Sequence, residues 1–176
     1  MPDLSPAHLG AVAQQVDGRF AAFAESVELV LVAVYEAILP LLSDELVPMA
    51  EICLGHHRQH AQAMAELAGE AATGEPDPVL LEALTPQIAE LSGSGSALRF
   101  AKDLEERMGA TYVSALGRLE QPEAVTLAAT IAPVEASHAV TLADLVDGTT
   151  EDLFPTGAFA PTDPLLGFDP ASTATS

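Results

Sequence analysis

The chain has 176 residues, of which 49% are hydrophobic, and its formal net charge is −20 at pH 7. This length suffices for one domain with a real core, and the hydrophobic share excludes an intrinsically disordered chain. With 26 acidic residues against 6 Lys and Arg, the composition argues against a nucleic-acid partner and against anionic membrane surfaces, because both would need basic side chains.

The single cysteine and the first ten residues bear on the compartment. Cys53 has no partner for an internal disulfide, and residues 1–10 (MPDLSPAHLG) lack the basic and apolar regions of a signal peptide. The longest apolar stretch, residues 27–42, is interrupted by two glutamates and a proline, which indicates a core helix and not a membrane span. We therefore expect a cytoplasmic protein.

Two long helices are predicted in the first 70 residues. Ser5 and Pro6 mark the first start, where a capping hydroxyl precedes a proline at the first helical position. Glycines weaken the front half, so we expect the firm part of this helix over residues 18–42. A second helix is predicted over residues 46–70, because its inward side chains recur at steps of four and three residues. These side chains are Cys53, His57, His60, Met64 and Leu67.

Residues 73–97 do not continue the long helices. TGEPDP at 73–78 and GSGS at 93–96 are typical of helix ends. Between them, residues 79–91 predict a short amphipathic helix that Pro86 interrupts. A segment of this length predicts a long connection and not a tight antiparallel turn.

Two further helices are predicted over residues 97–119 and 122–146, because apolar residues repeat there in a three-four pattern. Pro133 is expected to kink or loosen the second of them. After residue 148 the chain becomes rich in Pro, Thr and Ser and has no Lys or Arg. We therefore expect a helical bundle over residues 1–148 and an extended tail over 149–176. The tail would dock on the bundle or on a partner through Phe154, Phe159 and Phe168.

All four long helices place acidic or histidine side chains on their apolar faces. Glu28 precedes Tyr35 by seven residues, and Glu105 precedes Tyr112 by seven, so each tyrosine lies on the same face as its glutamate. The neighbouring Glu25 is interpreted as a surface acid. Because an unpaired charge in a core is costly, inward glutamates indicate that partners lie close by.

The other two long helices carry paired candidates. His57 and His60 are three residues apart, as are Glu135 and His138, so the members of each pair share a face. The order along the chain is a single carboxylate, a pair, a single carboxylate and a pair. His56 lies about 100° around the helix from His57, which favours a supporting or surface position.

This order is the layout of carboxylate-bridged two-metal sites in four-helix bundles, and the sequence resembles the ferritin-like superfamily. The resemblance covers residues 18–148, and its segments in chain order are VELVLVAVYEA (27–37), GHHRQHAQAMAEL (55–67), LEERMGATYVSAL (104–116) and PVEASHAVTLADL (133–145). It implies an all-α, up-down-down-up four-helix bundle with a long crossover between the second and third helices.

The resemblance also implies a metal site and its chemistry. The expected ligands are Glu28, His57, His60, Glu105, Glu135 and His138. Tyr35, Tyr112 and His56 would support them by hydrogen bonds. The expected cofactor is one or two transition metal ions, with iron first and manganese or zinc as alternatives. If the protein is an enzyme, it would be an oxidoreductase that handles oxygen or peroxide.

One position departs from the family pattern. The second helix has His57 where a bridging glutamate is expected, and a neutral imidazole cannot bridge two metals as a carboxylate does. More nitrogen and fewer negative ligands favour a single Fe, Mn or Zn ion, or an unequal pair.

Other interpretations stay open at this stage. A non-catalytic structural or interaction module with a degenerate site is the main alternative. Copper bound by Cys53, His57, His60 and Met64 fits those residue types. A homodimer or small homo-oligomer is expected, and not a storage cage, because no second apolar stripe is evident.

Overall fold

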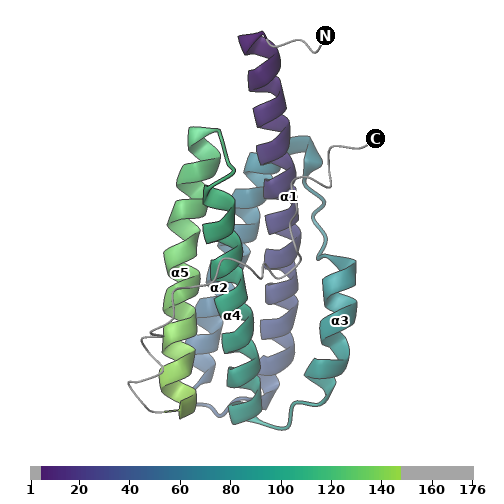
Figure 1. The fold of residues 1–176 in the computed structure, drawn as a ribbon. Coiled ribbons are helices and arrows are strands. Elements are labelled where there is room, and N and C mark those ends of the chain that lie inside the picture. The colour runs from purple at the N-terminus through teal and green to yellow at the C-terminus, as the bar shows by residue number, and fades with distance from the viewer. Residues whose placement is uncertain (1–4, 148–176) are drawn as a thin grey trace.

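The computed structural model describes residues 5–147, and this part of the chain is helical (Figure 1). Short 3₁₀ turns at Leu39–Leu41 and Gly69–Ala71 follow the first two long helices. The α-helices are α1 (Pro6–Ile38), α2 (Val47–Ala68), α3 (Pro78–Ala89), α4 (Ser94–Leu116) and α5 (Pro122–Asp147). The all-α prediction is confirmed.

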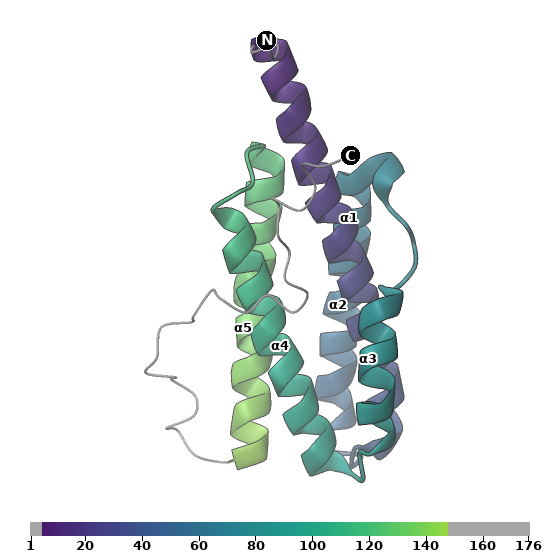
Figure 2. The ribbon, with the colours of Figure 1, turned by 45° about the vertical axis from the view of Figure 1, so that its right-hand side comes forward.

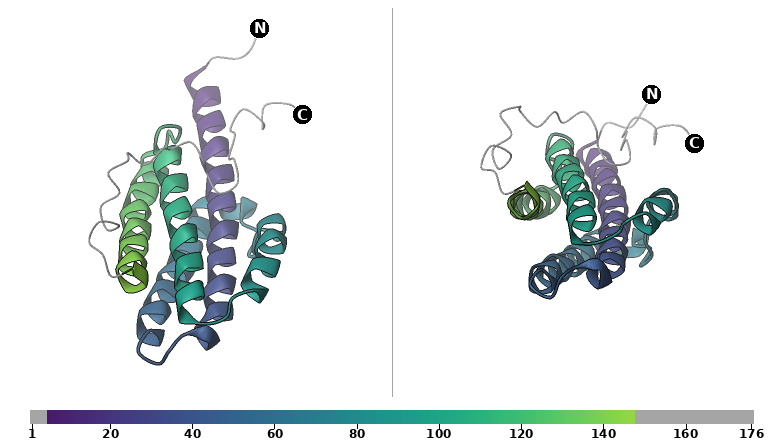
Figure 3. Two further views of the ribbon diagram at one scale, coloured as in Figure 1. Left: turned by 60° about the horizontal axis from the view of Figure 1, so that its bottom comes forward. Right: turned by 90° about the horizontal axis from the view of Figure 1, so that it is seen from below.

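Four long helices form the bundle as two antiparallel pairs, α1 with α2 and α4 with α5 (Figures 1 and 2). The connection after α2 returns along the bundle, so α4 begins at the end of the bundle where α1 finishes. The order is therefore up-down-down-up, as predicted. Viewed along the bundle in Figure 3, the short α3 lies outside the four long helices, beside α1.

Several helix ends differ from the predicted ones. α3 continues through Pro86 to Ala89, so the predicted interruption is wrong. Asp77 caps this helix by accepting a 2.8 Å hydrogen bond from the Leu80 N–H, which satisfies one of the free donors of its first turn. α4 begins at Ser94 and not at 97, after Gly93 with φ of 145°, a conformation that glycine adopts most readily.

α5 is a continuous helix through Pro133. Among residues 5–147, it has the only stretch long and apolar enough to cross a membrane by length and composition. Packing along α4 accounts for the buried part of this stretch, which is 39% of it, and α5 also carries two of the six candidate ligands inward. A core helix passes the same test, so the apolar stretch is weak evidence for a membrane span.

Two buried acids of α1 hold the connections of the bundle. Asp17 accepts hydrogen bonds from the backbone N–H groups of Glu120 and Gln121, between α4 and α5. Glu25 accepts bonds of 2.8 Å and 2.9 Å from the N–H groups of Thr73 and Gly74, after α2. Glu25 is only 3% exposed, so its interpretation as a surface acid is wrong.

We expect Glu25→Ala to lower the free energy of unfolding by about 1–3 kcal/mol, because it leaves two backbone donors without their acceptor. Urea denaturation followed by circular dichroism measures this change. Glu36→Ala is the matched control on the same helix, because among residues 5–147 Glu36 makes an exposed ion pair with Arg58, and such pairs contribute about 1 kcal/mol or less. Equal losses in the two variants would contradict the anchoring role of Glu25.

Candidate metal centre

The six predicted ligands converge at the middle of the bundle. α1 supplies Glu28 and α4 supplies Glu105, while α2 and α5 each supply a pair with three-residue spacing. Four of the six are fully buried: Glu28, His57, Glu105 and Glu135. The side chain of His60 is 12% exposed. The helical phase read from the sequence therefore places all six in one cluster.

His57 lies at the centre of this cluster. Its Nδ1 is 2.8 Å from Glu28 Oε2, and its Nε2 is 3.1 Å from Glu105 Oε1. Each ring nitrogen thus faces the single carboxylate of a different helix. His57 consequently links α1 and α4 across the core from its position on α2.

The two buried tyrosines bond the glutamates in a crossed arrangement. Tyr112 donates a 2.7 Å hydrogen bond to Glu28 Oε1, and Tyr35 donates a short one to Glu105 Oε1. Each tyrosine therefore holds the carboxylate of the opposite helix, and not the glutamate seven residues before it. Glu28 and Glu105 are each fixed by a tyrosine on one oxygen, and His57 approaches both.

Glu135 lies between the two histidines that reach the cluster from its edges. Its Oε1 is 2.8 Å from His60 Nδ1, and its Oε2 is 3.8 Å from His138 Nδ1. The short approach to His60 lacks hydrogen-bond geometry, so His60 Nδ1 and both Glu135 oxygens have no hydrogen-bond partner. Buried polar atoms rarely stay in this state, and here they converge on one point.

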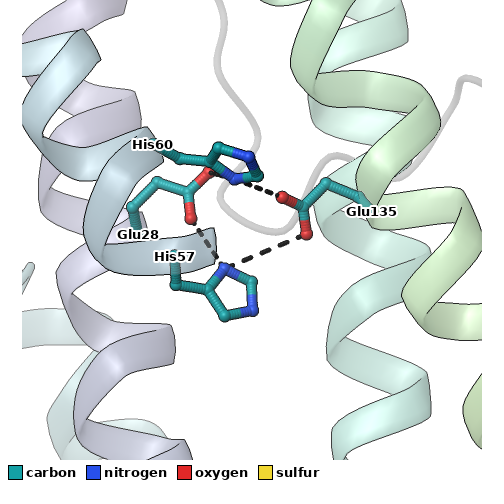
Figure 4. Close-up of side chains that lie close together, drawn as sticks. All are labelled: Glu28, His57, His60 and Glu135. Atoms are coloured by element: carbon teal, nitrogen blue, oxygen red, sulfur yellow. Dashed lines mark hydrogen bonds and ion pairs between the residues drawn. The ribbon is translucent and has the colours of Figure 1, made fainter. Parts of the chain in front are cut away.

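These contacts divide the cluster into two overlapping groups of potential ligands, each with its atoms within 4.8 Å of one another. The first group is Glu28, His57, His60 and Glu135 (Figure 4), and the second is His57, Glu105, Glu135 and His138. His57 and Glu135 belong to both. Cys53 belongs to neither group, and its thiol lies 3.8 Å from Met49 Sδ.

His56 also reaches the cluster, from its edge. Its Nδ1 is 2.8 Å from His138 Nε2, and the two rings stack with centroids 5.1 Å apart. Since the other nitrogen of His138 faces Glu105 at 3.2 Å, His56 fixes the orientation of the His138 ring. The supporting role of His56 toward a metal ligand stays a prediction.

Burial and charge act against each other on the acids of the cluster. Burial alone raises the pKa of Glu28 and of Glu105, but hydrogen bonds and charges from the histidines outweigh it and lower both pKa values. Glu135 differs, since burial and the charge of Glu28 keep its pKa above the ordinary value. Burial and the neighbouring carboxylates also raise the pKa of Tyr35 and of Tyr112 well above the ordinary value, so both stay protonated donors.

The histidines respond in the opposite sense. Burial lowers the pKa of His57, but the carboxylates of Glu105 and Glu28 outweigh it and raise the pKa well above the ordinary value. Against the same burial effect, Glu135 and Glu28 raise the pKa of His60 to about 9, while contacts with Cys53 and Glu105 raise that of His138 to about 12. Burial and the neighbouring histidines lower the pKa of His56.

The fold and the cluster define a class of protein: a four-helix bundle with a central set of glutamates and histidines. Comparison with protein families agrees, because the sequence model of the ferritin-like domain matches residues 23–148. The chain belongs to the ferritin-like family. Comparison with curated proteins and with solved structures finds no significant match.

Without metal, we expect the protein to lose stability as pH rises from 6.5 to 9. The raised pKa of His60, about 9, means that the folded state holds a proton that the unfolded state releases near pH 6.5. The stabilisation is therefore complete below pH 6.5 and gone above 9, and His60 alone contributes roughly 3 kcal/mol. Thermal melts in chelator across this range measure it.

The variant His60→Gln should make this pH dependence shallower without abolishing it, because His57 and His138 also have raised pKa values and contribute over the same pH range. His56→Gln is the matched control, because the pKa of His56 is lowered and its protonation does not favour the folded state. A metal-free stability that stays level or rises between pH 6.5 and 9 would contradict the assigned protonation of His60.

Proposed function

We propose that this protein binds transition metal ions in the cytoplasm through the central cluster. The observation that carries the proposal is the set of buried atoms without hydrogen bonds, His60 Nδ1 and the two oxygens of Glu135. A metal ion accepts lone pairs from both residue types at once, and a proton shared between them would require the hydrogen-bond geometry that is missing. The donor set fits the group that the family implies.

The first ion would be held by Glu28, His60 and Glu135, with Glu105 and His138 available at the other end of Glu135. Glu28 supports this assignment, because its Oε1 lies 3.5 Å from His60 Nδ1 and is fixed by Tyr112. Imidazole and carboxylate together suit iron, manganese and zinc. Iron is the first candidate.

His57 limits how far the family's two-metal chemistry applies to this chain. In the metal-free protein, His57 is protonated and hydrogen-bonded to Glu28 and Glu105, so it contributes a positive charge where the family pattern has a carboxylate. Fewer negative ligands stabilise two adjacent cations less well. We therefore propose a single ion or an unequal pair.

A bound iron or manganese ion would supply one-electron redox chemistry toward oxygen or peroxide. The residues of this chain prepare the site for that role. Tyr35 and Tyr112 orient the two single carboxylates, and His56 orients His138. Such supporting hydrogen bonds fix the direction of ligand lone pairs and raise ligand basicity.

A second candidate is a structural module without metal. It is favoured by the double hydrogen bond of His57 and by the two tyrosine bonds, which satisfy much of the cluster without an ion. Under this alternative, three glutamates and three protonated histidines balance one another. The two candidates differ in the response to chelator, since only a bound metal adds stability by mass action.

We expect the purified protein to bind Fe, Mn or Zn near stoichiometry, and His60→Ala or Glu135→Gln to weaken binding by roughly a hundredfold or more. Elemental analysis and competition with a chelating dye measure this. Glu105→Gln should also weaken binding, while its neighbour Glu106→Gln is the matched control, because Glu106 pairs with Lys102 at the surface. No bound metal after reconstitution with all three ions, with a melting temperature indifferent to chelator, would favour the structural module.

We expect His57→Glu to raise the metal content by about one ion per chain, because it supplies the missing carboxylate between the two ligand groups. In chelator the same variant should melt at a lower temperature, since four buried carboxylates would lack the imidazolium of His57. His57→Gln is the control, because it removes the positive charge without adding a negative one. An unchanged metal content in His57→Glu would show that His57 does not set the number of ions.

A further inference from the structure

The outer face of the α4–α5 pair contains an apolar groove. Its volume is about 330 Å³, within the range of roughly 300–1,000 Å³ that holds ligand-sized groups. No charged side chain lines the groove, and one of its lining residues, Val113, is 47% exposed. The lining residues are Gly109, Val113, Leu116, Ala129, Ala132, Pro133 and Ala136.

The exposed face of α5 continues this lack of charge. Between Glu123 and Asp144, the exposed side chains are all uncharged: Thr126, Ala129, Thr130, Pro133, Ser137, Val140 and Thr141. Three of these side chains are apolar and four carry a hydroxyl, so in a chain with a net charge of −20 the face around the groove suits an uncharged covering segment better than a charged one.

The floor of the groove adjoins the central cluster. A Cβ atom added at Gly109 would lie 3.6 Å from Glu135 Cβ and 3.9 Å from the Ala132 carbonyl oxygen. A Cβ at this position would make ordinary contacts with α5 and fill part of the groove, so the absence of a side chain at Gly109 adds to the depth of the groove. A bulky group in the groove would rest directly behind the helix turn that carries Glu135.

We propose that residues 153–162 of this chain (LFPTGAFAPT) occupy the α4–α5 groove, with Phe159 over Gly109. This segment carries no charge and includes two phenylalanines, while acids flank it at Glu151, Asp152 and Asp163. Its composition thus matches a groove without charge. The proposal does not depend on the metal site.

The connection from α5 is long enough for this placement. α5 ends at Asp147, and Pro133 in the groove lies 14 residues before it, about 21 Å back along the helix at 1.5 Å per residue. Phe159 follows Asp147 by 12 residues, which span up to roughly 40 Å when extended. Phe154 follows it by only seven, which reaches about 23 Å and leaves little slack.

A tethered segment is a better occupant than a second copy of the chain. Two chains that each carry a charge of −20 repel one another. An attached segment meets the groove at an effective concentration in the millimolar range without this cost. The same negative charge disfavours an anionic lipid surface as the covering partner.

A disulfide test distinguishes these occupants. In the full chain carrying Val113→Cys with Ala160→Cys, we expect an intramolecular disulfide to form about tenfold faster than in Val79→Cys with Ala160→Cys. Val79 is the control because it is 71% exposed and belongs to α3, which contributes no residue to the groove. The native Cys53 is only 3% exposed and does not compete. Adding Phe159→Ser should abolish the acceleration.

Two results of this test would overturn the proposal. Equal rates in the two pairs would mean that residue 160 visits the groove no more often than another exposed position. A predominantly intermolecular disulfide at Val113→Cys, seen as a dimer on a non-reducing gel, would assign the groove to a second copy.

Chymotrypsin digestion of the native chain gives an independent measurement. Cleavage after Phe159 should be about tenfold slower than cleavage after Phe168, because docking protects the first site. Val113→Glu should remove this difference by placing a charge in the groove, whereas Val79→Glu should preserve it. Circular dichroism verifies that both variants fold. Equal cleavage at the two sites in the unmodified chain would reject docking of this segment.

Discussion

The central constraint on this structure is the burial of three carboxylates at one level of a four-helix bundle. Glu28, Glu105 and Glu135 are removed from water, where an unpaired charge is strongly unfavourable. Positive charge or a metal must therefore lie among them. The three histidines of the cluster meet this need with protons in the metal-free protein. A metal ion would displace protons from the histidines that ligate it, which couples binding to pH.

The hydrogen bonds of the central cluster also join the two halves of the bundle. α1 with α2 and α4 with α5 are each local antiparallel pairs, whereas the bonds from Tyr35 to Glu105 and from Tyr112 to Glu28 cross between the pairs. His57 adds contacts from α2 to both α1 and α4. The site is consequently part of the packing that holds the pairs together, so changes at the site affect stability as well as binding.

Periodicity in the sequence predicts the helices and the inward face of each, because side chains three, four and seven residues apart share a face. It therefore places the six candidate ligands correctly at one centre. It does not predict the partner that a side chain meets across the core, such as the crossed tyrosine bonds to Glu28 and Glu105. The interpretation of Glu25 as a surface acid is wrong for the same reason, since its partners are backbone donors 48 and 49 residues away. The continuity of α3 through Pro86 depends on local geometry that composition does not determine.

The length of α1 is constrained by three of its acids, Asp17, Glu25 and Glu28. They lie on one helix, and each is bound to a different part of the molecule: the α4–α5 connection, the segment after α2, and the central cluster. Inserting one residue between any two of them would rotate the later ones by about 100° and displace them by about 1.5 Å. At least one of the three attachments would then be lost. The stretch of α1 from Asp17 to Glu28 is thus of fixed length.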